Sequence, residues 1–456
     1  MSIDDLENHS KTAIHSLVAH FLKSNNYHET LKQFEEEHGK PINPQPLHAN
    51  ESLEEIIKDR INYNELAKEF DNVVDVNKEL PEDLQALNKN QFGNWTSPYP
   101  SVGQLLKGID GLVISSSYDP LNNLLFISTN DTKLYIVDAS SNNVITEIIK
   151  VIETSVIKKI ITLDNNEVLL VGIDGKLNYF KYDYADSKFD LKLISSHQAH
   201  KRLVVEVKHT KINGVNYFVS LGWDFYLRVF KLSETNQFEL ISEVKLTGQG
   251  SCFDIIEHKN ELIIVLGKND NTLLDVFILQ DLKDLVLKYK ISLNDAEFSS
   301  SSFSPRFLII QKTSDLYTPL IAVGTSHEPY MRLIIVSLKE LDHIDDNTNN
   351  STITTSPIKR NQIMKNLNSL SPQDKYSQSL LSFRIGNDIN KCTGIWVAGD
   401  DGIIRGIDLI HDKVLVEIEA HKGKIKNFLT FTDKYGYEQL LTGGVERDVK
   451  IWKLKN

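Results

Sequence analysis

The chain has 456 residues, of which 41% are hydrophobic and 25% charged, a composition typical of a folded protein of two or three domains. Its two cysteines, Cys252 and Cys392, are too few and too far apart for a disulfide framework or a zinc site, which favours a reducing compartment. The formal net charge of −12 argues against a protein that coats duplex nucleic acid, because phosphate contacts need clustered Lys and Arg.

The N-terminal region is acidic and carries no targeting pattern. It begins MSIDDLENHS, with acids where a secretory or mitochondrial signal needs basic residues, and no stretch of eighteen apolar residues follows. Residues 1–90 hold 18 Asp and Glu against 9 Lys and Arg, so most of the net charge lies there. We therefore expect a cytoplasmic or nuclear protein without membrane contact, with an acidic head and a nearly neutral body.

Two short helices are expected within residues 13–37. Leu17, Val18, Phe21 and Leu22 form one apolar stripe at helical spacing. This helix should end at Asn25-Asn26, because Asn tolerates the left-handed conformation, and a second helix should begin near His28. Two helices of this length cannot bury a core alone, so the stripe needs a cover.

These residues resemble the LisH motif, with two apolar pairs four residues apart, a turn with Tyr, then Thr, Phe and Glu. Asn26 stands where the motif usually has Gly, and Leu31 where it has Ala. The resemblance implies homodimerisation, or pairing with another LisH protein, within residues 1–40; the alternative is a helical hairpin docked on the protein's own body. The implied interface consists of Leu17, Val18, Phe21, Leu22, Tyr27, Leu31 and Phe34.

A third helix is expected next, within an acidic helical extension over residues 41–78. Apolar residues recur at roughly helical spacing among many acids in residues 51–74. It could extend the dimer contact or pack on the body. Residues 79–101, with three prolines, are interpreted as a linker.

From residue 102 to residue 456 the pattern is that of an all-β repeat protein. Short Val, Ile, Leu, Phe and Tyr runs alternate with Asn, Asp and Gly turns. An acidic residue precedes a strand at Asp131, Asp174, Asp224, Asp401 and Glu446, and neighbouring intervals of 43, 50 and 45 residues approach the length of a four-stranded propeller blade. With two divergent copies between Asp224 and Asp401, the expected fold is a mainly β, seven-bladed propeller.

The repeats resemble WD repeats, although only Ile407-Asp408 and Trp452-Lys453 stand at the Trp-Asp position and neither keeps both residues. In that family a His, a strand Ser or Thr and the turn acid form hydrogen bonds across each blade. The resemblance implies one set of His200, Ser220 and Asp224, completed by Phe230, and another of His421, Thr442 and Glu446, completed by Trp452.

Two further features concern the ends and an insertion. VKIWKL reaches the C-terminus without a fourth strand, so residues 102–107 are the candidate strand to close the ring. Residues 347–372 hold 14 Asn, Ser or Thr, which predicts a disordered insertion near 343–375 between blades five and six. Ser356-Pro357 and Ser371-Pro372, beside Lys359-Arg360, are candidate phosphorylation sites, unless the insertion has no function.

The sequence contains none of the common linear catalytic motifs. The sequence has no P-loop, zinc-helix, nucleophile-elbow or Cys-x-x-Cys pattern. His197 and His200 lack the further ligands that a metal would need, so no metal and no cofactor are expected. Trp223, Phe225 and Tyr226 share a tight turn, where bulky side chains either pack under a neighbouring loop or meet a partner; packing is favoured.

The sequence therefore predicts a non-catalytic scaffold or receptor subunit of a multiprotein complex. It would dimerise through the LisH segment and bind other proteins through propeller loops, and the resemblance points to ubiquitin ligase, chromatin or motor-linked complexes. The alternatives are a propeller enzyme or small-molecule binder, and an RNA-associated propeller, which would need a contiguous basic face.

Overall fold

In a computed structural model the chain forms two compact units, Met1–Glu79 and Leu80–Asn456. The structure describes residues 3–44, 52–54, 56–58, 82–95, 98–153, 155–185, 188–294, 303–314, 317–338, 357–360, 362–378, 380–384 and 390–454. No helix among these residues is long and apolar enough to cross a membrane.

The first unit contains a helical hairpin of α1 (Ile3–Ser24) and α2 (His28–His38). Asn26 adopts a left-handed φ of 62°, as the sequence predicted, and the Tyr27 amide donates to the Leu22 carbonyl at 2.8 Å. Gly39 ends α2 with a φ of 74°, a conformation that glycine adopts without steric cost. The third predicted helix lies almost entirely outside the described residues.

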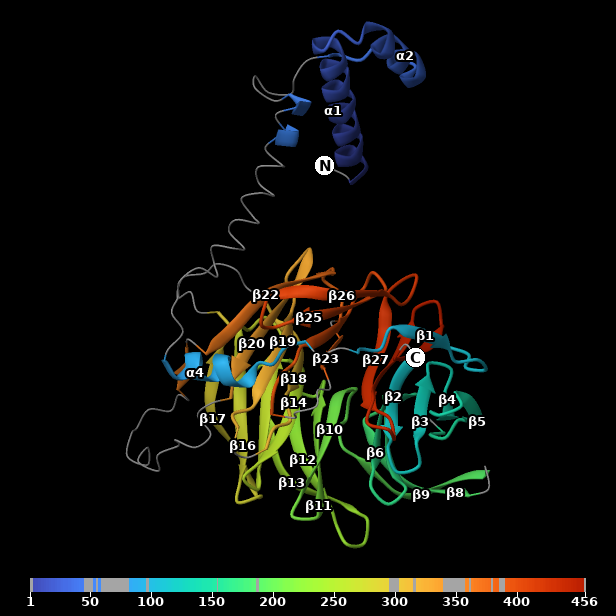
Figure 1. The fold of residues 1–456 in the computed structure, drawn as a ribbon, viewed down its shortest axis with the longest axis vertical. Coiled ribbons are helices and arrows are strands. Elements are labelled where there is room, and N and C mark those ends of the chain that lie inside the picture. The colour runs from blue at the N-terminus through green and yellow to red at the C-terminus, as the bar shows by residue number, and fades with distance from the viewer. Residues whose placement is uncertain are drawn as a thin grey trace. The chain divides into compact units, whose positions relative to one another are not determined.

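The second unit is a seven-bladed β-propeller, which confirms the predicted fold (Figure 1). Each blade is a sheet whose strands follow one another in the chain, and blades are numbered here from the N-terminal side. Blades 1 to 3 contain β2 (Val113–Asp119), β3 (Leu124–Thr129), β4 (Lys133–Asp138), β5 (Asn143–Ile149); β6 (Ile157–Leu163), β7 (Glu167–Gly172), β8 (Lys176–Ala185), β9 (Lys188–Gln198); β10 (Val204–Ile212), β11 (Val215–Gly222), β12 (Tyr226–Leu232) and β13 (Phe238–Lys245).

Blades 4 to 7 follow the same order, with two exceptions described below. They contain β14 (Gly250–His258), β15 (Glu261–Lys268), β16 (Leu273–Gln280), β17 (Asp284–Ser292), β21 (Ile358–Lys359); β18 (Pro305–Ile310), β19 (Leu320–Thr325), β20 (Tyr330–Ser337), β22 (Ile363–Pro372); β23 (Leu380–Phe383), β24 (Ile395–Ala398), β25 (Ile403–Asp408), β26 (Lys413–Glu419); β27 (Ile425–Thr432), β28 (Glu438–Gly444), β29 (Val449–Lys453) and β1 (Val102–Leu105).

The core of the propeller is divided into layers between neighbouring blades. The second and third strands of each blade are buried on both faces, so they appear in the sequence as continuous apolar runs such as LLFIST and LIAVGT. Phe126 and Val168, for example, belong to the layer between blades 1 and 2, while Leu125 and Ile451 belong to the layer between blades 1 and 7. Each blade therefore gains its hydrophobic stabilisation from both neighbours, and the ring depends on closure.

The ring is closed by strand exchange between the two ends of the propeller sequence. β1 pairs antiparallel with β29, with Val102 opposite Lys453 and Leu105 opposite Lys450. Figure 1 shows β1 beside the C-terminal strands. The predicted closing strand is confirmed, and blade 7 thereby acquires the fourth strand that its own segment lacks.

The predicted disordered insertion between blades 5 and 6 is wrong in its position and in its C-terminal half. Residues 363–372 form β22, the outer strand of blade 5, and residues 358–359 form β21, which pairs parallel with β17 of blade 4. The insertion thus lies within blade 5. The strand was missed because its sequence is rich in Asn and Ser. An outer strand buries little apolar surface, and Ser369 and Ser371 stand at buried positions that apolar residues occupy in other strands.

The predicted linker is also wrong over most of its length. Residues 82–95 and 98–101, together called the strap here, contain α4 (Glu82–Gln91) and extended segments that pack on blades 5 to 7 before β1. Leu84 and Phe92 are buried in the layer between blades 5 and 6, beside Met331 and Leu409. Pro98 and Pro100 favoured a linker, yet they lie in the extended part after α4, where no backbone N–H is required.

Candidate functional site

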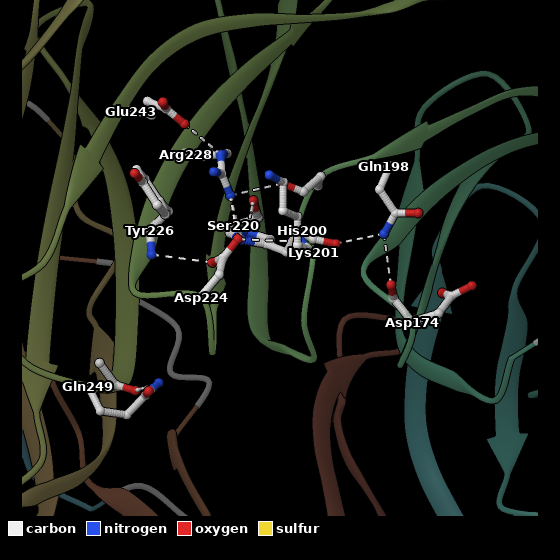
Figure 2. A network of polar contacts seen from close by, with 12 residues as sticks. Asp174, Gln198, His200, Lys201, Ser220, Asp224, Tyr226, Arg228, Glu243 and Gln249 are labelled. Carbon is white, nitrogen blue, oxygen red and sulfur yellow. Dashed lines mark hydrogen bonds and ion pairs between the residues drawn. The ribbon is translucent and has the colours of Figure 1, made fainter.

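Blade 3 brings together the hydrogen-bond set expected from the sequence. His200 Nδ1 lies 2.8 Å from Asp224 Oδ1, and His200 Nε2 lies 2.8 Å from Ser220 Oγ (Figure 2). The carboxylate beside Nδ1 assigns the imidazole proton to that nitrogen, so Nε2 accepts from the serine hydroxyl. Phe230 packs in the layer between blades 2 and 3 and lies 5.1 Å from the His197 ring, ring centre to ring centre.

Charge around this set favours a neutral imidazole and an ionised carboxylate. Burial lowers the pKa of His200 below its ordinary value, and the contact with Asp224 only partly offsets that effect. Burial alone would raise the pKa of Asp224, but hydrogen bonds from Arg228 and His200 hold it below the usual range. Arg228 also donates to Glu243 at 2.7 Å and to the Ala199 carbonyl at 3.1 Å, which joins three segments of the blade.

Blade 7 repeats the arrangement with Thr and Glu. His421 Nδ1 lies 2.6 Å from Glu446 Oε1, and His421 Nε2 lies 2.8 Å from Thr442 Oγ1. The Trp452 indole donates to the same threonine oxygen at 3.0 Å. Burial again lowers the pKa of His421, which keeps the ring neutral at physiological pH.

Both sets have the order of acid, imidazole and hydroxyl that hydrolases use for nucleophilic catalysis. In blade 3, however, the Ser220 hydroxyl and the His200 ring are fully buried, and in blade 7 the same holds for Thr442 and His421. A nucleophile must reach its substrate and stand near a group that stabilises the oxyanion. The buried sets can therefore tie a loop and a turn to a strand, but they cannot attack a bound molecule.

The remaining turn acids are placed at equivalent turns of their blades. Asp131 accepts from the Thr129 hydroxyl at 2.5 Å, and Asp174 accepts from the Lys176 amide at 3.3 Å. Asp401 accepts from Arg405 at 3.1 and 2.6 Å through two nitrogens. These acids stabilise the turn between the second and third strands of their blades.

Sequence reasoning missed the basic partners of the turn acids. Arg228 and Arg405 each stand four residues after the acid with which they form an ion pair, and that shared spacing was a usable signal. Blade 4 departs from the pattern, because Lys268 and Asp275 form a buried ion pair at 2.7 Å. No sequence rule for the repeat would have paired these two residues.

The aromatic turn of blade 3 differs from the expectation that its side chains are packed. Trp223 is 53% exposed and Phe225 is 38% exposed, whereas Tyr226 is half-buried and lies under the Arg228 guanidinium at 4.4 Å. Both rings are therefore presented at the surface.

The head presents its apolar residues incompletely covered. Leu17, Val18, Phe21 and Leu22 of α1 and Leu31 and Phe34 of α2 are only half-buried, and Tyr27 is 54% exposed. The described part of α2 contains no buried residue. His15 contacts the Phe34 ring edge-on at 5.9 Å, which holds the two helices together at one end.

Only one of the two candidate phosphorylation sites lies among the described residues. Ser356 lies outside the described residues, whereas Ser371 is buried near the end of β22, where its amide donates to the Ser369 hydroxyl at 3.2 Å. A kinase could reach Ser371 only after that strand end had left the blade. Among the described residues, no three His, Cys, Asp or Glu side chains gather as a metal site.

A helical LisH segment followed by a seven-bladed β-propeller defines the class of protein. The LisH model of the UCP007778 family matches residues 12–43, and the β-propeller model of the same family matches residues 74–453. The chain belongs to this family. It is also similar to "Uncharacterized protein YGR117C" of Saccharomyces cerevisiae, at 24% identity over 439 residues that cover 86% of this chain and 87% of that protein.

Proposed function

We propose that this protein is a non-catalytic scaffold that dimerises through its LisH segment, or pairs there with another LisH protein, and binds partner proteins through propeller loops. The observation that carries the proposal is the half-covered apolar surface of α1 and α2. A soluble helical hairpin gains stability only when such a surface is buried, and a second hairpin provides a matching surface by symmetry.

The propeller supports the scaffold role through its construction. Its hydrogen-bond sets are buried and fix loops, and the turn that the blade 3 set fixes carries the exposed Trp223 and Phe225. Linking two propellers through one helical contact would raise the effective concentration of the second propeller at a repeated or dimeric target. Such a scaffold would serve a ubiquitin ligase, chromatin or motor-linked complex in the cytoplasm or nucleus.

The dimer is tested by changing Phe21 and Leu22 together to Asp. Two carboxylates without partners in an apolar interface are strongly unfavourable, so the mass of the full chain from light scattering should fall from dimer to monomer. The β-rich circular dichroism spectrum should stay the same, because the propeller is a separate compact unit. As a control, Asp at Lys32 and Gln33, both exposed on α2, should leave the dimer mass intact.

Three results would contradict the proposal. A monomeric wild-type chain would show that the hairpin has no partner of its own kind. An unchanged dimer mass in the double variant would place the interface elsewhere. Loss of the β-rich spectrum would show that the hairpin is part of the propeller fold rather than a contact between subunits.

A further inference from the structure

The turn of blade 3 keeps an aromatic residue where the backbone favours glycine. Phe225 has a φ of 66°, and the equivalent turn positions of blades 2 and 6 are Gly175 and Gly402, with φ of 89° and 80°. Thr132 and Arg447 occupy this position in blades 1 and 7. A bulky residue in the left-handed region is strained, and such strain persists at positions where the side chain has a use.

Trp223 and Phe225 flank a turn that is held rigidly from below. The Trp223 amide donates to the Leu203 carbonyl at 2.9 Å, and the Leu246 amide donates to the Phe225 carbonyl at 2.7 Å. The carboxylate of Asp224, which separates the two aromatic residues in the sequence, accepts from Arg228 and contacts His200 (Figure 2). The backbone that carries both rings is therefore fixed before a ligand binds, which lowers the ordering cost of binding there.

Cationic residues stand on the two backbone segments next to this aromatic turn. Lys201 and Arg202 lie on the loop before β10, and the Lys201 amide donates to Asp224 Oδ2 at 3.4 Å (Figure 2). Lys245 is opposite Tyr226 in the sheet, one residue from Phe225. All three side chains are exposed.

The nearby acids are mostly engaged by the blade itself. Arg228 contacts both Asp224 and Glu243, at 2.9 and 2.7 Å. Asp174, half-buried on the next turn, accepts from the Lys176 amide. On the blade 3 segments that flank the aromatic turn, the exposed residues Lys201, Arg202 and Lys245 are thus positive, in a chain whose net charge is −12.

We propose that Trp223 and Phe225, with Lys201, Arg202 and Lys245, form the binding site for an acidic peptide segment that carries one large apolar or aromatic residue. This surface is called the Trp223 rim. The anchor residue would lie against the two rings, and Asp or Glu on either side of it would meet the three cations. The inference rests on the proposed scaffold function and names the chemical class of its partner.

The site is tested by selecting random twelve-residue displayed peptides on the full-length protein, with counter-selection on the Trp223→Ala variant. The enriched peptides should combine Asp and Glu with a Trp, Phe or Leu. Binding of the most enriched peptide, synthesised with a fluorescent label, is then measured by anisotropy. Trp223→Ala and the Lys201→Glu, Arg202→Glu double variant should each weaken it at least tenfold, and added salt should weaken binding to the wild type.

Two controls separate binding from folding. Tyr435→Ala removes an aromatic side chain that is 73% exposed on blade 7, and it should leave the affinity unchanged. Phe225→Gly should weaken binding at least fivefold while the unfolding temperature stays equal or rises, because glycine relieves the left-handed strain. Light scattering on the same samples reports the dimer, so failure of the rim and failure of the head are distinguished.

Several outcomes would overturn the proposal. They are the enrichment of basic peptides, the absence of any enriched peptide, or equal affinities for the Trp223→Ala and Tyr435→Ala variants. A fluorescent thirty-nucleotide RNA of random sequence is measured in parallel. If it binds and the Lys201→Glu, Arg202→Glu variant abolishes that binding while peptides stay unbound, the rim recognises RNA instead.

Discussion

Replacement of Trp95 by Ala tests the strap, since this side chain fastens it to blade 6. The Trp95 ring lies edge-on to Trp396, with ring centres 5.0 Å apart, and the Arg384 guanidinium lies over it at 4.2 Å. Gly394 and Gly406 leave room for the ring, because a Cβ at either residue would come within 2.5 Å of it. The blade is thus shaped to receive this one tryptophan.

The expected loss is about 3 kcal/mol in the free energy of unfolding. Replacement of a fully buried Trp or Phe by Ala costs roughly 3–5 kcal/mol. Trp95 is half-buried, which reduces that cost, while loss of the contact with Arg384 adds about 0.5–1 kcal/mol. The Arg384 side chain would keep its bonds to Glu438 and to the Pro98 carbonyl, so no unpaired charge is left behind.

Urea unfolding of the full chain, followed by far-ultraviolet circular dichroism, measures this loss. Trp223→Ala is the matched control, because it removes the same side chain from an exposed position and should cost less than about 0.5 kcal/mol. Equal unfolding midpoints for the two variants would refute the interpretation that the strap is an integral part of the propeller. Limited proteolysis within residues 82–101 should also become faster in Trp95→Ala alone.

Three further predictions concern the blades. Because burial lowers the pKa of His200 and His421, protonation of either ring favours the unfolded chain. The free energy of unfolding should therefore be constant above about pH 7 and fall as the pH drops below the ordinary histidine pKa near 6.5. Urea midpoints at pH 7.5 and 5.5 measure this difference, and a His421→Gln variant should show a smaller one. Lys268→Ala should lower the free energy of unfolding by about 3–5 kcal/mol, because it leaves the buried Asp275 carboxylate without its closest cation. The double variant Lys268→Met, Asp275→Leu should recover much of that loss in the same urea assay. Ser371→Asp should lower the unfolding temperature by several degrees, since it buries a charge near the end of β22; an unchanged temperature would mean that this strand end is readily displaced.

The repeats made much of the propeller predictable from the sequence. An acid at a tight turn followed by an apolar strand is a local pattern, and it recurs at Asp131, Asp174 and Asp224 with nearly constant spacing. The closing strand followed from counting, because blade 7 lacked one strand and residues 102–107 offered one. These features depend on contacts within one blade or on the need to close the ring.

The features that were missed depend on contacts between distant segments. β22 has the composition of a disordered loop, and it is ordered because Leu333 and its neighbours in β20 provide a partner strand. The strap is held by Trp396 and Met331, more than 200 residues away in the sequence. Trp223 shows the opposite error, since packing was favoured over exposure to a partner for a large apolar side chain that lies at the surface.

The strap also determines where mechanical load enters the ring. β1 is a four-residue strand with every residue exposed, and a pull on its N-terminal end would act directly on the pairing that closes the propeller. The strap lies before β1 in the chain, so tension arriving from the N-terminal side reaches the contacts of Leu84, Phe92 and Trp95 first. These contacts distribute the load over blades 5 and 6, and the closing strand is relieved of it. A pull on the N-terminal segment would therefore have to detach the strap before it opened the ring.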